Sequence, residues 1–328
     1  VQACSARRTR RRTCVRTSAM AYYLGIDGGG TKTRCVLGDE HNVLATAVSG
    51  GSNIVRLGEG PAREALHAVI RHICAVGKIS IPGIHYICIG ASGAGRPEVA
   101  AKVQSIVAEL DPQLSAVRIE VVGDTVIALE AAFGSGPGVI VISGTGSVAF
   151  GRDAAGHTVR AGGWGFAISD EGSGQWIGRQ AVSAMLRARD EGRETALAAH
   201  ILETWKLADL DAAIQFANST PPPEFPRLFP VVLRAAEEGD SDARELLLRA
   251  GTELTALAAI VLERIAPAPP HVPVATTGSV FRQSAEVRRV FYNQLDERFP
   301  GIESRKDFVD PVLGALARAR AAGRRETN

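Results

Sequence analysis

The chain has 328 residues, of which 45% are hydrophobic and 22% are charged, with 35 glycines and a formal net charge of +2. This composition is typical of a globular protein and excludes fibrous, collagen-like and wholly disordered chains. At about 100 to 200 residues per domain, the length predicts two lobes with enough chain to bury a core.

Residues 1–20 form a basic segment that differs from the rest of the chain. They hold six of the 37 lysines and arginines and no acidic residue, which leaves the remainder mildly acidic. We interpret 1–20 as a disordered leader or an upstream extension rather than a targeting peptide, because no apolar core follows the arginines. The acidic remainder gives no reason to expect nucleic acid as a partner. No apolar run approaches the ~20 residues of a membrane span, so we expect no membrane partner either.

The five cysteines include no CxxC pair, and those beyond the leader lie in apolar surroundings, as Cys88 does between Ile87 and Ile89. Such cysteines are typical of buried thiols in a reducing compartment, and we expect a cytoplasmic protein.

The first half of the chain has the pattern of an α/β lobe. An apolar run at 22–26 ends in a glycine-rich turn, and β-type residues resume at 35–37 and 42–45, as in a hairpin meander. Apolar residues at helical spacing predict a helix over 61–76. The continuous apolar runs at 84–89 and 119–122 predict strands covered on both faces, with a helix at 97–110 between them.

The second half repeats this pattern and then becomes mostly helical. A strand at 139–142, a glycine turn and β-type residues at 148–150 predict a second, related lobe. Helices follow from about 173 and over 242–265, the latter with a capping box of Asp242 and Glu245. We read 221–230 as a surface connector and 267–273 as a proline-rich turn before a strand at 274–277. A last helix begins after Asp310-Pro311.

Two glycine-rich turns are candidates for binding phosphate. They are Asp27-Gly28-Gly29-Gly30-Thr31-Lys32-Thr33 and Ser143-Gly144-Thr145-Gly146-Ser147. Successive backbone N–H groups in such turns make anion-binding nests, because glycine lacks the Cβ that would block close approach. Neither turn fits a Walker A loop or a dinucleotide fingerprint, since β-type residues rather than a helix follow each one. A plain hairpin turn is the alternative for either turn taken alone.

Two aspartates lie at the ends of predicted strands, where ligand crevices form in α/β sheets. Asp27 could reach a magnesium ion on phosphates held by the adjacent turn, or it could serve only as a turn residue. Asp124 could be a reactive carboxylate, a helix N-cap, or both.

The segment 162–178 combines many glycines with two tryptophans and two adjacent acids. Trp164 could flank a sugar ring or be packed in the core. Asp170 and Glu171 precede a predicted helix, where acids favour the helix dipole, so capping is the alternative to a binding role.

The four motifs together resemble the BadF/BadG/BcrA/BcrD ATPase family of the actin-like ATPase and sugar-kinase superfamily, most closely the N-acetylglucosamine kinases. The matching motifs are Asp27 to Thr33, Ser143 to Ser147, Gly163-Trp164-Gly165 and Asp170-Glu171-Gly172-Ser173-Gly174. The resemblance covers roughly 22–320. It implies an α/β, two-lobed actin-like (ribonuclease H-like) fold, each lobe a mixed sheet flanked by helices, with the active site in the interlobe cleft. We expect an N-terminal lobe at 21–134, a C-terminal lobe at 135–310, and a helix at 311–324 packing back on the first lobe.

The same resemblance implies roles for individual residues. Asp124 matches the catalytic aspartate, and Asp27 matches the residue that supports Mg²⁺. The implied nucleotide-binding residues are Gly29, Gly30, Thr31, Lys32, Gly144, Gly146, Ser147, Gly278 and Ser279, with Thr145 beside the phosphates. The implied sugar-binding residues are Asn53, Thr145, Gly163, Trp164 and Asp170; from its own sequence context, Asn53 reads as a turn residue.

These features predict an ATP- and Mg²⁺-dependent kinase that phosphorylates the 6-hydroxyl of N-acetylglucosamine or a close relative such as glucosamine. A small-molecule sugar and ATP are the expected partners, and the sequence leaves open whether the protein forms a homodimer. One alternative is a BadF-type ATPase that activates a radical dehydratase or reductase through a shared iron–sulfur cluster, although the cysteines form no convincing ligand set. Another is a non-catalytic sugar sensor, which would need a DNA-binding module that 20 arginine-rich residues do not supply.

Overall fold

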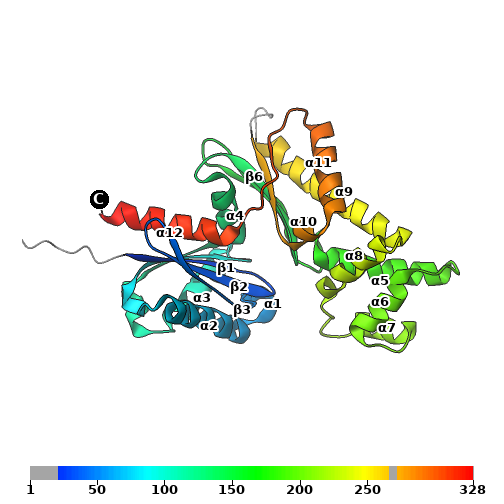
Figure 1. Cartoon of the computed structure of the whole chain (residues 1–328), viewed down its shortest axis with the longest axis horizontal. Coiled ribbons are helices and arrows are strands. Elements are labelled where there is room, and N and C mark those ends of the chain that lie inside the picture. The colour runs from blue at the N-terminus through cyan, green and yellow to red at the C-terminus, as the bar shows by residue number, and fades with distance from the viewer. Residues whose placement is uncertain (1–20, 266–271, 328) are drawn as a thin grey trace, which may run out of the picture.

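The computed structural model describes residues 21–265 and 272–327, so the expected basic leader lies outside the described residues, as does most of the proline-rich turn at 267–273. Two α/β lobes lie side by side, each built on a five-stranded mixed sheet (Figure 1). The predicted two-lobed α/β architecture is therefore confirmed.

The two sheets have the same topology. In each, three strands form an antiparallel meander, a later strand pairs in parallel with the first strand of that meander, and a further strand pairs in parallel with this later strand. The first sheet has the order β3-β2-β1-β4-β5, with β1 (Tyr22–Gly28), β2 (Lys32–Gly38), β3 (Val43–Gly50), β4 (Ile84–Ala91) and β5 (Arg118–Gly123). The second has the order β10-β9-β6-β7-β8, with β6 (Gly138–Ser143), β7 (Ser147–Arg152), β8 (Thr158–Gly162), β9 (Val274–Thr277) and β10 (Ser304–Arg305). The repeat read from the sequence is thus a repeat of sheet topology.

The helices pack on these sheets and on one another. In the first half of the chain they are α1 (Ile54–Leu57), α2 (Glu59–Gly77), α3 (Pro97–Ala108) and α4 (Asp124–Phe133). In the second half they are α5 (Gly174–Asp190), α6 (Ala196–Trp205), α7 (Leu210–Ala217), α8 (Phe229–Glu237), α9 (Ser241–Ile265), α10 (Ser279–Gln283), α11 (Ala285–Arg298) and α12 (Pro311–Thr327). Short 3₁₀ turns occur at Ile81–Gly83, Pro112–Ala116 and Phe225–Leu228. None of the helices in the described part of the chain is long and apolar enough to cross a bilayer.

Three cysteines fall within the described residues, and all three are free and buried, as expected. Cys35 and Cys88 lie in strands of the first sheet and Cys74 lies in α2, where burial raises the pKa of each thiol.

Two expectations about the second half of the chain are wrong. The segment 221–230 is more than a surface connector, because Phe225, Leu228 and Phe229 are buried in the core of the second lobe. Its aromatic side chains, rather than its prolines, decide where it lies. The cap of α9 is provided by Asp240, whose Oδ1 accepts the Ala243 N–H at 2.8 Å, and not by a box of Asp242 and Glu245, since α9 begins at Ser241.

The helix α4 packs on both sheets and so joins the lobes. Its Ala128 and Leu129 belong to an apolar cluster with Ile140 of β6 and Ala275 of β9. On its other side, Ile127 packs with Val312, Leu316 and neighbours of α12 and the first sheet.

The last helix, α12, returns to the first lobe and lies along β1 and α4 (Figure 1). Its approach depends on glycines. A Cβ on Gly25 of β1 would lie 2.4 Å from the Leu316 nitrogen, and a Cβ on Gly314 would lie 2.0 Å from the Ile127 carbonyl oxygen. Both contacts are with backbone atoms, which cannot move aside as a flexible side chain could.

We expect Gly314→Ala to lower the free energy of unfolding by about 1 to 3 kcal/mol, because the added methyl forces α12 away from α4. Gly60→Ala in α2 is the matched control, since a Cβ there meets no atom within 4 Å. Urea unfolding of both variants checks this, and a Gly314→Ala protein as stable as the parent would contradict the packing described.

Candidate active site

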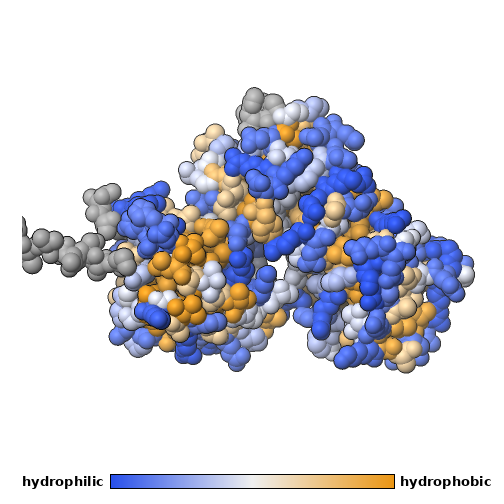
Figure 2. Space-filling view, in the orientation of Figure 1, coloured by the Kyte–Doolittle hydropathy of each residue, from blue (hydrophilic) through white to orange (hydrophobic). Residues whose placement is uncertain are grey.

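The two glycine-rich turns meet at one pocket between the lobes. This pocket, of about 180 Å³, is lined by Thr31 of the first turn and by Gly144 and Thr145 of the second. A Cβ on Gly30 would lie 3.8 Å from the Thr145 methyl carbon, so the turns are in direct proximity. In the space-filling view, the surface is hollowed between the two lobes (Figure 2). The two glycine-rich turns therefore lie next to each other, as a shared binding site requires.

The first turn also positions Asn53. The Gly29 N–H donates to the Lys32 carbonyl at 3.1 Å, and the Gly29 carbonyl accepts the N–H groups of Ser52 and Asn53 at 3.0 and 3.2 Å. Asn53 Oδ1 then caps α1, accepting the N–H groups of Val55 and Arg56. Because the cap uses Oδ1, a role in sugar binding would fall to the Nδ2 donor.

The second turn is fastened to the start of α5. Ser143 Oγ donates to the Gly172 carbonyl at 2.8 Å, and Ser147 Oγ donates to the Glu171 carbonyl at 2.6 Å. In return, the Gly174 N–H donates to the Gly144 carbonyl at 2.8 Å. The two motifs occur together in the sequence because each provides the hydrogen-bond partners of the other.

Gly278 and Ser279 lie against the same turn. Gly278 has φ 108°, and a Cβ on it would lie 2.0 Å from the Ser143 carbonyl oxygen, so no other residue fits. Ser279 begins α10 and lines the pocket with Gly144.

Asp170 is held in an unfavourable environment. It is 7% exposed, has φ 72°, and packs against Gly146, where a Cβ would lie 3.0 Å from Asp170 Oδ2. Burial raises the pKa of Asp170, and the Ser147 N–H, at 3.4 Å, and the positive charge of Arg160 only partly offset this rise. A buried carboxylate in a left-handed conformation is typical of a functional position, since both features cost stability.

Trp164 is not packed in the core, so the buried alternative for this residue is wrong. Its side chain is 69% exposed, with the Arg160 guanidinium 4.6 Å from the ring centre. Gly163, at φ 70°, helps to form the projecting loop that presents it.

The parallel strands bring Asp27 and Asp124 to the same edge of the first sheet. Asp27 pairs with Gly90 of β4, and Gly123, which precedes Asp124, pairs with Ala91. Ser92, just after β4, completes the group: its Oγ donates to Asp124 Oδ2 at 2.6 Å, and its N–H donates to the Gly28 carbonyl at 3.1 Å. Ser92 is not among the site residues predicted from the sequence, although only a glycine and an alanine separate it from the predicted strand at 84–89.

The two carboxylates lack full compensating charge. Burial raises the pKa of Asp27 to about 7, and the neighbouring Asp124 carboxylate contributes to this rise, against smaller opposing effects of Arg34 and Lys32. Arg34 is already paired with Asp310 through two contacts of 2.5 and 2.9 Å. No group of three or more His, Cys, Asp or Glu side chains suited to a metal occurs among the described residues. Mg²⁺ takes one or two protein carboxylates and completes its shell with water and phosphate oxygens, so the Asp27 and Asp124 carboxylates fit this ion.

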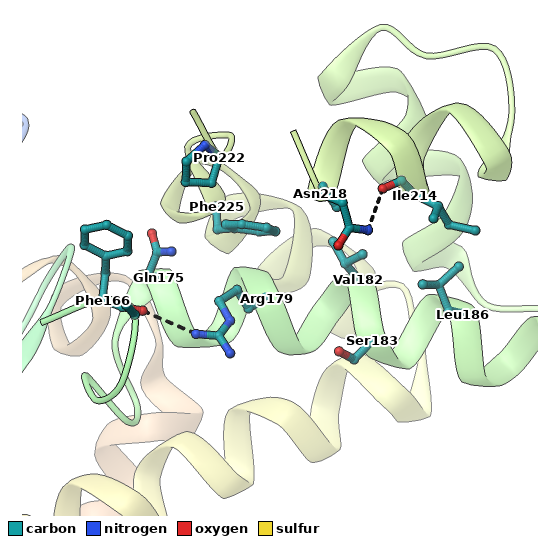
Figure 3. A pocket seen from close by; sticks show the side chains of 12 residues that line it. Phe166, Gln175, Arg179, Val182, Ser183, Leu186, Ile214, Asn218, Pro222 and Phe225 are labelled. Atoms are coloured by element: carbon teal, nitrogen blue, oxygen red, sulfur yellow. Dashed lines mark hydrogen bonds between the residues drawn. The ribbon is translucent and has the colours of Figure 1, made fainter. Parts of the chain in front are cut away.

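A second and larger pocket, of about 390 Å³, lies in the second lobe between α5 and the segments around Asn218 and Phe225. Figure 3 shows Arg179 and Ser183 of α5 facing it. None of the sequence-predicted site residues lines this pocket. We therefore place the candidate active site at the smaller interlobe pocket, which four of the predicted residues line: Thr31, Gly144, Thr145 and Ser279. The residues that line it do not include Asp27, Asn53, Asp124, Trp164 or Asp170.

This arrangement defines a two-lobed α/β protein with a pocket between its lobes, and the comparisons with known proteins give its family. Residues 24–319 match the model of the BadF/BadG/BcrA/BcrD ATPase family, and the chain belongs to this family. It is similar to the N-acetylmuramic acid/N-acetylglucosamine kinase of Clostridium acetobutylicum, with 32% identity covering 92% of this chain and 99% of that protein.

Solved structures agree with the fold. A candidate N-acetylglucosamine kinase of Chromobacterium violaceum has a TM-score of 0.74 at 27% identity, covering 91% of this chain and 98% of that one. A ROK family glucokinase of Streptomyces griseus, solved with glucose and AMPPNP, has a TM-score of 0.58 at 17% identity, covering 92% and 99%. The predicted family and the actin-like fold are thereby confirmed.

We expect Asp27→Asn to stabilise the metal-free protein more at high pH than at low pH. The folded-state pKa of Asp27 is near 7, so between about pH 4 and pH 7 the unfolded chain releases the carboxyl proton of Asp27 while the folded chain retains it. The parent protein therefore loses stability as the pH rises through this range. The variant has no such loss. Thermal melting in EDTA across this range measures the difference; a constant difference between variant and parent at all pH values would contradict the buried, uncompensated carboxylate.

Proposed function

We propose that this protein is an amino-sugar kinase that transfers the γ-phosphoryl group of ATP to the 6-hydroxyl of N-acetylglucosamine or a close relative such as glucosamine. The family membership and the names of its relatives support a carbohydrate kinase. The observation that carries the proposal is the meeting of Thr31 and Thr145, from turns in different lobes, at one pocket. Asp27 lies at the end of the strand that leads into the first of these turns, and the Asp124 carboxylate is close enough to raise its pKa.

The nucleotide is held by backbone groups from both lobes. Gly29, Gly30, Thr31 and Lys32 bind the phosphates from the first lobe, and Gly144, Thr145, Gly146 and Ser147 bind them from the second. Gly278 and Ser279 lie on the adenosine side. N–H groups fixed in this way stabilise the charge of phosphoryl transfer without reorganisation. Mg²⁺, held at Asp27, supplies neutralisation of phosphate charge when it is bound.

Asp124 is the general base in this proposal. The Ser92 hydroxyl and the Thr125 N–H each donate to one of its carboxylate oxygens, which fixes the orientation of the group. From this position Asp124 accepts the proton of the acceptor hydroxyl as that oxygen attacks the γ-phosphorus.

The sugar is bound on the side of the cleft formed by Asn53, Thr145, Gly163, Trp164 and Asp170. The exposed ring of Trp164 offers an apolar face to the C–H groups of a sugar. The Asp170 carboxylate accepts hydrogen bonds from the sugar hydroxyl groups, and the Asn53 amide nitrogen donates hydrogen bonds to them. Closure of the lobes then excludes the water that would compete for the phosphoryl group.

We expect Asp124→Asn to lower kcat at least ~10²-fold while leaving the KM for sugar within a few-fold, because the variant loses the base but keeps the shape of the site. Asp211→Asn, at an exposed carboxylate in α7, is the control. Steady-state kinetics measure both variants, and near-normal turnover of Asp124→Asn would remove Asp124 from this role.

The proposed function is tested by magnesium-dependent ADP release across a panel of glucosamine, N-acetylglucosamine, N-acetylmuramic acid and glucose. We expect release that depends on an amino sugar, with a phosphate ester at the 6-position identified by NMR. ADP release that is independent of every sugar, together with a brown, iron-containing protein after anaerobic purification, would instead support the activating ATPase.

A further inference from the structure

Arg56 has a buried nitrogen with no partner, beside the candidate phosphate pocket. It is the third residue of α1, and its side chain lines the pocket with Thr31, Gly144 and Thr145. Nη1 of Arg56 is one of two buried side-chain nitrogen or oxygen atoms without a hydrogen-bond partner in the part of the chain that the structure describes. A Cβ on Gly30 would lie 3.3 Å from this nitrogen, so Nη1 lies against the first glycine turn.

The other end of the guanidinium is paired across the cleft. Nη2 of Arg56 lies 3.5 Å from Glu224 Oε1, and Glu224 precedes the 3₁₀ turn Phe225–Leu228 of the second lobe. The pair is loose, because the Glu224 side chain is 57% exposed while that of Arg56 is 21% exposed. The one contact engages Nη2 and does not satisfy Nη1.

An unsatisfied guanidinium nitrogen away from water is costly, and arginine matches the oxygens of a phosphate group through a planar fork of N–H donors. Here Arg56 lines a pocket whose walls include residues of the glycine turns of both lobes. An anion in the pocket would satisfy Nη1 and would also be within reach of the backbone N–H groups of those turns.

We propose that Arg56 binds the terminal phosphate of a nucleoside triphosphate, and that Glu224 is the counter-ion which this phosphate displaces. This rests on the proposed function only in taking the pocket as a nucleotide site. Since Arg56 belongs to the first lobe and Glu224 to the second, the exchange replaces a weak bridge between the lobes with one made through the bound nucleotide.

Isothermal titration calorimetry with AMPPNP and with ADP, both in magnesium buffer, tests the proposal without any sugar. Arg56→Met should weaken AMPPNP binding about 10- to 100-fold, with a smaller effect on ADP, which lacks the terminal group. Arg56→Lys should recover part of the affinity, because it keeps the charge and loses the fork. Arg63→Met, in α2 and paired with Glu109 on the surface, is the matched control and should bind as the parent does.

Glu224→Gln should tighten AMPPNP binding about 2- to 5-fold, because the carboxylate no longer competes for Arg56. Most of this gain should vanish when Glu224→Gln is combined with Arg56→Met. Circular dichroism and melting curves establish that each variant is folded.

The proposal is overturned if Arg56→Met and Arg56→Lys bind AMPPNP as the parent does, if ADP binding falls as much as AMPPNP binding, or if Glu224→Gln has the same effect in both backgrounds. Absence of AMPPNP binding by the parent protein also overturns it. An Arg56-dependent preference for AMPPNP in a protein that phosphorylates no amino sugar would support this inference and refute the proposed function, so the two fail separately.

Discussion

The position of α4 between the two sheets is the constraint on which the candidate active site depends. Ala128 and Leu129 pack against the second lobe, and Ile127 packs against α12 over the first. Because Asp124 is the first residue of this helix, the element that joins the lobes also carries the proposed base. Close packing allows little freedom here, since Gly314 of α12 lies against the backbone of α4.

The candidate site contains charged groups that lack full pairing partners in the absence of a ligand. Asp27 and Asp124 form an acidic pair with too little cationic compensation, and Arg56 contributes a buried donor with no partner among the described residues. The magnesium–nucleotide complex that we propose as the ligand would bring the opposite charges, a cation to the carboxylates and an anion to the guanidinium. Such a site is costly in the free protein and favours the ligand for the same reason.

The repeated sheet topology explains how one architecture supplies two glycine-rich turns that meet at one pocket. In each lobe, the turn joins the first two strands of the meander: Gly29 to Thr31 between β1 and β2, and Gly144 to Gly146 between β6 and β7. The lobes differ in the segment that comes after the meander. The second lobe adds the segment from Gly163 to Gly174, which fastens to its turn and supplies Asp170, whereas the first adds the loop that ends in the cap at Asn53.

The sequence alone determined eight of the ten strands among the described residues, the two glycine turns and the burial of Cys35, Cys74 and Cys88, because each depends on local pattern: apolar runs, the conformational freedom of glycine and apolar neighbours. It did not predict the strands β8 and β10. It did not place Ser92 beside Asp124, pair Arg34 with Asp310, bring Arg56 to Glu224 or bury Phe225. Those arrangements were decided by the tertiary structure, because each joins side chains that are far apart along the chain, and local spacing holds no information about which distant surfaces pack together.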